Sequence, residues 1–183
     1  LPRALPVCDH YADTEVRMRK ALALQSELGP IFDITFDCED GAPVGQESEH
    51  AELVAQLVLS SENKFNRVGV RIHDPSHPSW KKDVATLIGK AGTRIAFVMI
   101  PKVESAQQTQ MVIDEINHVA KTANIHRAIP IQALVETHGA LHDVYALAAL
   151  PQVESLSFGL MDFVSAHHGA IPAEAMDRGQ FDH

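Results

Sequence analysis

Short apolar runs alternate with amphipathic segments along the whole chain. The apolar runs are rich in β-branched residues and lie at 4–10, 31–41, 67–73, 94–103, 129–137 and 153–162. The segments between them repeat apolar residues every three or four positions, which predicts helices at 14–29, 48–61, 81–92, 107–123 and 138–150. Thr14 and Ser105 stand where helix N-caps are expected. Alternating strands and helices predict a parallel sheet covered by helices.

A polar residue or pair stands near the end of each apolar run, 26 to 34 residues after the previous one. They are Asp9 with His10, Glu39 with Asp40, Arg71, Lys102, Glu136 and Asp162. This spacing is close to the length of one βα unit. Functional residues gather at the carboxyl ends of parallel strands in both barrels and open sheets.

The repeat favours an α/β TIM (β/α)8 barrel over an open doubly wound sheet. Neither GxGxxG nor GxxxxGK[ST] follows any predicted strand, which disfavours nucleotide-binding forms of the open sheet. About six βα units are present, whereas a complete barrel needs about 250 residues. We therefore expect one domain over residues 1–183, truncated or disordered at its C-terminal end. The tail 171–183 has the pattern of a loop or a helix start.

Composition narrows the class of protein. The formal net charge of −9 argues against a nucleic-acid partner, and the chain lacks an apolar run of the ~18 residues that a membrane span needs. Two cysteines without a C-x-x-C motif, and a start without a signal-peptide pattern, predict free thiols in the cytoplasm. The eleven histidines form no zinc motif.

Glu136 and Asp162 end two consecutive apolar runs, with one helix between them. Acids at the tops of neighbouring parallel strands, which lie ~4.8 Å apart, can share one cation. Two carboxylates plus water suit Mg²⁺, and Mn²⁺ is a second candidate. The alternative is that both acids are solvated residues before a helix, where carboxylates are common.

The second run ends in three acids, Asp37, Glu39 and Asp40, which could support metal-bound water or simply form a polar loop. Arg71 ends an otherwise apolar run and needs an anionic partner. That partner is either a substrate carboxylate or the acids of the preceding run. Lys102 is expected to be solvated or ion-paired rather than a Schiff-base nucleophile. Gly159 marks either a turn or a close approach of ligand to backbone.

Five motifs, in order and in register, resemble the HpcH/HpaI aldolase and citrate lyase β-subunit family. They are DCEDGAP at 37–43, VRI at 70–72, PKVES at 101–105, ALVET at 133–137 and FGLMD at 158–162. The resemblance implies a Mg²⁺-dependent TIM-barrel lyase that makes or breaks a carbon–carbon bond. It also implies a homo-oligomer, either a trimer or a hexamer.

Carried over by motif, the resemblance makes Glu136 and Asp162 metal ligands and Arg71 the catalytic group that grips the substrate carbonyl. Gly159 and Asp162 would bind a substrate carboxylate through backbone N–H groups, with Asp37, Glu39 and Asp40 supporting the site from outside. The implied substrate is a 3-hydroxyacyl-CoA such as malyl-CoA, citramalyl-CoA or citryl-CoA.

The sequence also departs from the family pattern. No basic residue follows Asp40 until Lys64, so the usual acyl-CoA contacts are not expected from this segment. Two alternatives therefore stand beside the thioester lyase. One is an aldolase acting on free 4-hydroxy-2-oxo acids. The other is a non-catalytic subunit that binds acyl-CoA. The general base is not identified.

Overall fold

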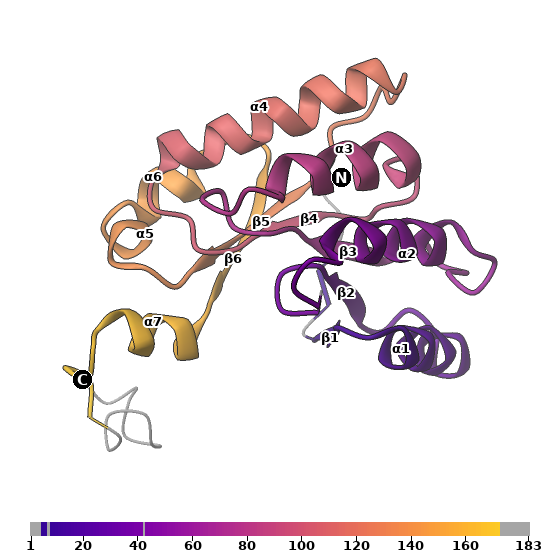
Figure 1. The fold of residues 1–183 in the computed structure, drawn as a ribbon, viewed down its shortest axis with the longest axis horizontal. Coiled ribbons are helices and arrows are strands. Elements are labelled where there is room, and N and C mark those ends of the chain that lie inside the picture. Colours follow the sequence, from indigo (N-terminus) through magenta and orange to yellow (C-terminus); the bar gives the residue numbers. More distant parts are fainter. Residues whose placement is uncertain (1–4, 7, 42, 173–183) are drawn as a thin grey trace.

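Six parallel strands form one curled sheet in a computed structural model that describes residues 5–6, 8–41 and 43–172 (Figure 1). The strands are β1 (Asp9–Ala12), β2 (Asp33–Asp37), β3 (Val68–Arg71), β4 (Val98–Ile100), β5 (Ile131–Val135) and β6 (Val153–Phe158). Each strand pairs with the strand next in sequence, in the order β1-β2-β3-β4-β5-β6. The predicted α/β fold is therefore confirmed as a half-barrel.

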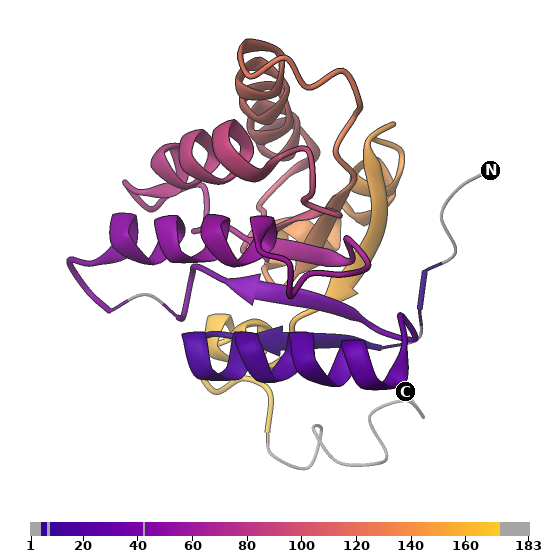
Figure 2. The ribbon, with the colours of Figure 1, turned by 90° about the vertical axis from the view of Figure 1, so that its right-hand side faces the viewer.

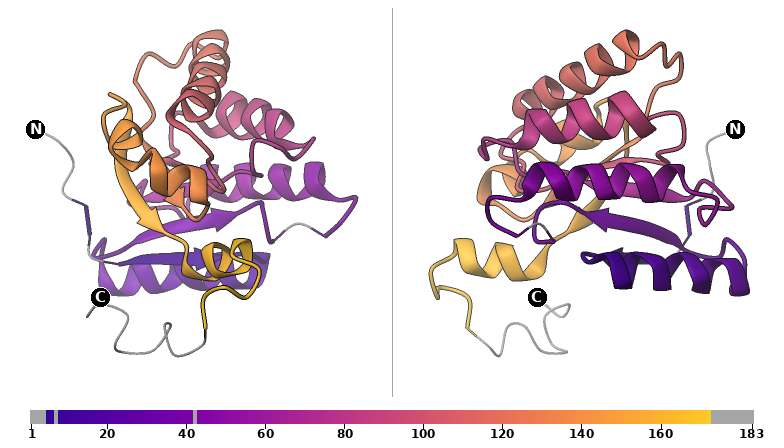
Figure 3. Two further views of the ribbon diagram at one scale, coloured as in Figure 1. Left: turned by 90° about the vertical axis from the view of Figure 1, so that its left-hand side faces the viewer. Right: turned by 45° about the vertical axis from the view of Figure 1, so that its right-hand side comes forward.

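Helices follow the strands around the outside of this sheet. They are α1 (Glu15–Leu28), α2 (Glu47–Leu59), α3 (Trp80–Ala91), α4 (Ala106–Thr122), α5 (His138–His142), α6 (Val144–Ala148) and α7 (Leu160–Ala166). Helices α1 to α4 succeed one another along the convex side (Figure 2), whereas α7 lies apart from them beyond the end of β6 (Figure 1 and the right view of Figure 3). No described helix has the length and apolar character needed to cross a membrane.

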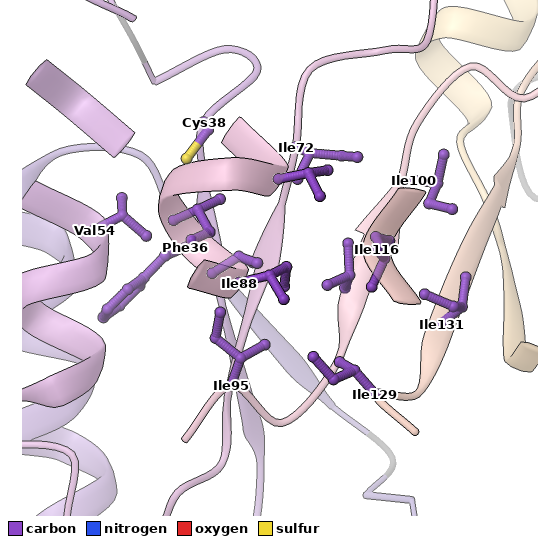
Figure 4. Close-up of a cluster of buried hydrophobic side chains, with 14 of the residues drawn as sticks. Phe36, Cys38, Val54, Ile72, Ile88, Ile95, Ile100, Ile116, Ile129 and Ile131 are labelled. Atoms are coloured by element: carbon purple, nitrogen blue, oxygen red, sulfur yellow. The ribbon is translucent and has the colours of Figure 1, made fainter. Parts of the chain in front are cut away.

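The main hydrophobic core lies between the sheet and the helices. Its members include Phe36, Ile72, Ile100 and Ile131 from the strands and their ends, with Ile88 and Ile116 from α3 and α4 (Figure 4). A smaller cluster of Phe97, Met99 and Leu134 lies apart from it. Gly69 leaves room for the Phe97 ring, since a β-carbon on Gly69 would lie 2.2 Å from that ring.

Most predicted elements are confirmed, with corrections to the first strand, to the helix 138–150 and to the sixth strand, which stops at Phe158 rather than 162. The first strand is Asp9–Ala12 rather than 4–10, and residues 4 and 7 of that range lie outside the described residues. The predicted helix 138–150 is two short helices, because Asp143 leaves the helical run and its carboxylate accepts a hydrogen bond from Ala106 N at 2.9 Å. Most of the tail, 173–183, is also outside the described residues.

The two predicted N-caps differ. Ser105 Oγ accepts a hydrogen bond from Gln108 N at 3.1 Å and so caps α4. Thr14 holds the N-cap position of α1 in an extended conformation, but its side chain makes no capping hydrogen bond. The boundaries of both helices nevertheless follow the apolar pattern.

Candidate functional site

Glu136 is a buried carboxylate at the carboxyl edge of the sheet. It directly follows β5 and is 2% exposed. Its Oε1 atom accepts a hydrogen bond from the backbone N–H of Lys102 at 2.7 Å. Burial raises the pKa of Glu136, and the nearby charge of Asp162 raises it further. A carboxylate in this setting favours a cation beside it.

Gly159 lies against this carboxylate. Its N–H donates to the carbonyl of Val135 at 3.1 Å, which continues the β5–β6 pairing to the strand end. A β-carbon at this position would lie 2.1 Å from Glu136 Oε2. The group that comes close to Gly159 in the structure is the Glu136 side chain, and the predicted approach of a ligand to its backbone stays a prediction.

Asp162 lies on the same side of the sheet but not on a strand. The sequence pattern placed it at the end of the sixth strand, whereas β6 stops at Phe158 and Asp162 sits in the first turn of α7. Its carboxylate is 3.9 Å from Lys102 Nζ. Asp162 and Glu136 line one cavity of about 590 Å³, so the structure brings the predicted pair together.

Arg71 is paired with the acids of the β2 end. Its guanidinium donates to Asp37 at 2.8 and 2.6 Å and to Asp40 at 2.7 Å, and Nη1 lies 3.0 Å from Glu39 Oε2. Burial opposes the charge of Arg71, but these partners outweigh it and raise its pKa. The sequence left two kinds of partner open for Arg71, and the structure shows the acids at the end of β2 in that role.

Lys102 joins this network at the next strand. Its ammonium contacts Glu39 Oε1 at 2.8 Å, and Lys102 adopts a positive φ of 47°. Burial opposes its charge, but Glu39 and Asp162 raise its pKa above the usual value. An ammonium held in this way stays protonated, which confirms the prediction of an ion-paired lysine.

The cavity beside Glu136 is the concave interior of the half-barrel. Its wall carries inward-facing polar residues from several strands, including Asp9, Tyr11, Gln132, Ser155 and Ser157. The sequence interpretation named Asp9 but not the other four residues, because it considered the ends of the predicted strands rather than their faces. Their shared signal is period-two alternation, in which polar residues recur at one parity inside apolar strands.

Tyr11 links this wall to Arg71. Its hydroxyl donates to Met99 Sδ at 2.5 Å, and the Arg71 guanidinium carbon lies 5.5 Å from the centre of its ring. A guanidinium over a ring face is attracted by the π-electrons. Burial raises the pKa of Tyr11, so the hydroxyl stays protonated and able to donate.

The donor set fits a hard divalent cation. Within the part of the chain that the structure describes, no three His, Cys, Asp or Glu side chains are grouped to hold a metal. Glu136 and Asp162 are two carboxylates on one cavity wall, and Mg²⁺ typically takes one or two carboxylates and keeps several waters.

The histidines near the site form a ring cluster. His138 and His167 lie 3.8 Å apart between ring centres, and Phe163 is 4.3 Å from His167. His167 Nδ1 also contacts the carbonyl of Phe163 at 2.6 Å. This cluster packs α7 against the start of α5, and His168 follows α7 on the surface.

The family model for HpcH/HpaI aldolase/citrate lyase matches residues 31–171. A citrate lyase from Burkholderia xenovorans LB400 has a similar crystal structure, with 54% identity and a TM-score of 0.93 over 99% of this chain and 57% of that one. The citrate lyase beta subunit of Mycobacterium tuberculosis, complexed with oxaloacetate and magnesium, shares the fold. Its identity is 22% and its TM-score 0.69, over 98% of this chain and 70% of that one.

A curated relative is the L-malyl-CoA/beta-methylmalyl-CoA lyase of Cereibacter sphaeroides, which is 23% identical over 134 residues. The match covers 73% of this chain and 42% of the relative. The chain thus spans less than half the length of that relative. The family match over residues 31–171 contains Arg71, Glu136 and Gly159, which line the cavity of about 590 Å³, and Lys102, which lines a neighbouring cavity together with Glu136.

Proposed function

This chain belongs to the HpcH/HpaI aldolase/citrate lyase family, and we propose that it forms the metal- and substrate-binding part of a carbon–carbon lyase acting on a 3-hydroxyacyl-CoA. The observation that carries the proposal is the pair Glu136 and Asp162 on the wall of a cavity that Arg71 also lines. Malyl-CoA, citramalyl-CoA and citryl-CoA are the proposed kinds of substrate. The malyl-CoA lyase among the relatives supports this class.

Glu136 and Asp162 would hold Mg²⁺, or Mn²⁺ in its place. A divalent cation supplies Lewis-acid polarisation of a carbonyl oxygen when it is bound. The magnesium and oxaloacetate in the Mycobacterium tuberculosis complex support this choice. Burial limits the access of water to the Glu136 carboxylate, and Gly159 keeps this side chain at the cavity wall.

Arg71 would stabilise the negative charge that develops on the substrate oxygen. Asp37, Glu39 and Asp40 hold the guanidinium in one orientation before substrate arrives. Guanidinium has five N–H groups, and these contacts leave an Nη1 N–H for the ligand. Preorganised donors of this kind lower the barrier because they need no rearrangement during the reaction.

A side cavity next to Arg71 is the proposed place for the CoA part of a thioester substrate. It has a volume of about 640 Å³ and is lined by His10, Arg17, Lys20 and Arg71, together with the acids Asp13, Asp37 and Asp40 that pair with the two arginines. Cationic side chains next to the substrate-binding arginine suit the phosphates of CoA. We propose that Arg17 and Lys20 of α1 and His10 of β1 take the place of the basic residues that are missing after Asp40.

Two measurements test the proposal. Calorimetry measures Mg²⁺ binding, and the release of acetyl-CoA reports the cleavage of L-malyl-CoA. Glu136→Gln should lose both, because an amide is a weak Mg²⁺ ligand. Glu49→Gln is the matched control, since Glu49 is an exposed residue of α2 far from the cavity. A Glu136→Gln protein that kept both properties would show that Glu136 is not the ligand.

The free-acid aldolase is tested in the same assay with a 4-hydroxy-2-oxo acid in place of the thioester. Arg17→Gln with Lys20→Gln should raise KM for malyl-CoA and leave the free acid unaffected. Cleavage of the free acid alone would favour the aldolase. Binding of acyl-CoA without any cleavage would favour a non-catalytic subunit.

We also propose a homo-oligomer, a trimer or a hexamer, and a cytoplasmic location. Both cysteines are free, with Cys38 buried and Cys8 exposed, which suits a reducing compartment. Light scattering on the protein in solution measures the number of subunits. A monomer at all protein concentrations would contradict the proposed homo-oligomer.

A further inference from the structure

A second polar cavity lies at the opposite end of the sheet from Glu136. It has a volume of about 560 Å³ and is formed by residues that precede β2, β3, β4 and β5. Three of its lining residues are arginines, Arg67, Arg94 and Arg127. We call it the arginine cavity. Its position at the amino ends of the strands separates it from the proposed catalytic edge.

The arginines are incompletely neutralised. Arg67 donates to Asp33 at 2.6 Å, and this is the one carboxylate that the described contacts give to the three guanidinium groups. All acceptors recorded for Arg94 are neutral: Asn66 Oδ1 at 2.7 Å, and the carbonyls of Leu59, Ser60 and Asn63. Two positive charges therefore face the cavity in a chain whose formal net charge is −9.

Arg127 is the least satisfied of the three. Its Nη2 atom donates to the carbonyls of Gly92, at 2.8 Å, and Ile95. No described residue accepts a hydrogen bond from its Nε or Nη1 atoms. Burial lowers the pKa of Arg127, and no described carboxylate offsets this effect. A partly desolvated guanidinium with open donors favours an anion.

Capping of helix ends explains only part of this arrangement. Arg94 covers carbonyls at the end of α2, and Arg127 covers one that follows α3. Cations are common at helix C-termini, where they interact with the helix dipole. Among the donors of Arg127, helix capping uses only Nη2. Capping also does not require Arg94 and Arg127 to share a cavity with Arg67.

We propose that the arginine cavity binds a small phosphorylated molecule. Guanidinium groups bind phosphate oxygens through paired, planar N–H donors, and three arginines can contact one phosphate from different sides. Phe65, Pro30 and Pro130 supply an apolar wall for the remainder of the molecule. The volume lies within the ~300–1,000 Å³ range of small-molecule sites.

The experiment is calorimetric titration of the full-length protein with inorganic pyrophosphate at constant ionic strength. Thr93 is an exposed lining residue, so Thr93→Glu adds a competing carboxylate without removing any arginine contact. Thr93→Gln is the matched neutral control. Arg127→Gln removes the guanidinium with open donors. Cleavage of malyl-CoA is measured in parallel for every variant.

The wild type and Thr93→Gln should bind pyrophosphate alike. Thr93→Glu and Arg127→Gln should bind at least about tenfold more weakly, because charge-assisted hydrogen bonds are lost or opposed. Lyase activity should not change, since the cavity is at the far end of the sheet. If Arg127→Gln fails to fold, the Thr93 pair decides. Equal binding by all variants, or no binding by the wild type, would overturn the proposal.

Discussion

Oε2 of Glu136 occupies the space that a β-carbon on Gly159 would fill, at a separation of 2.1 Å. The glycine belongs to the end of β6 and the acid to the end of β5, so adjacent strands fit together at this point. The position of Glu136, the proposed metal ligand, therefore depends on the absence of a side chain at Gly159.

Gly159→Ala should displace Glu136 from the cavity wall. The added methyl group is tolerated by the backbone, because φ is −93°, but not by the carboxylate. We expect Mg²⁺ affinity to fall by more than about tenfold, or ~1.4 kcal/mol. Calorimetry measures this. Gly89→Ala is the control, because its β-carbon would lie 3.9 Å from Val119 and helix stability should rise by ~0.5–1 kcal/mol. Equal Mg²⁺ affinity in both variants would refute the explanation.

Arg71→Met should destabilise the fold. It leaves the carboxylate of Asp37 buried without its cation and leaves Glu39 with Lys102 alone, and breaking a buried pair in this way typically costs about 3 kcal/mol. Urea unfolding measures the change. Asp40→Asn removes a partner whose side chain is 69% exposed, and it should cost less than about 1 kcal/mol. A smaller loss of unfolding free energy for Arg71→Met than for Asp40→Asn would contradict the stabilising role of this ion-pair network.

Lys102 should not form a Schiff base with an oxo acid. Its pKa is raised by Glu39 and Asp162 despite burial, so the amine stays protonated at neutral pH and is not nucleophilic. Borohydride reduction in the presence of an oxo acid should leave the mass of the peptide containing Lys102 unchanged. A reduced adduct on that lysine would show that the amine is free to react.

His73 should stabilise the fold more at low pH than at high pH. Its Nδ1 atom contacts Asp83 at 2.6 Å, and both groups are buried. Burial opposes the imidazolium, but Asp83 outweighs it and raises the pKa of His73 above its ordinary 6.5. The contribution is complete below about pH 6.5 and is lost as pH rises through the folded-state pKa.

The measurement is the difference in unfolding free energy between wild type and His73→Gln at pH 5.5 and pH 9. We expect a difference on the order of 1 kcal/mol larger at pH 5.5. His118→Gln, an exposed change on α4, is the matched control. A His73→Gln deficit that stays constant with pH would mean that the ion pair with Asp83 does not contribute.

The sequence predicted the α/β layers and the edge of the sheet where Glu136 and Arg71 lie, because both follow from residue patterns that are local in the chain. Apolar periodicity located the helices and strands, and strand ends placed Glu136 and Arg71 at the same edge. The choice between the two predicted kinds of partner for Arg71 was not possible from the sequence, because it depends on the register that puts Asp37 directly opposite Arg71. Tyr11 was missed with the first strand, and the split at Asp143 follows from a contact with α4 that is distant in sequence.

The order of the strands also bears on how the chain acquires its structure. Because each strand pairs with the next one along the chain, every pairing closes a loop that contains little more than one helical segment. Short loops have a low entropic cost of closure, and local pairing speeds folding. The sheet can therefore grow by one unit at a time from β1 during synthesis, and the Glu136–Gly159 contact can form only when the last of its strands has been added.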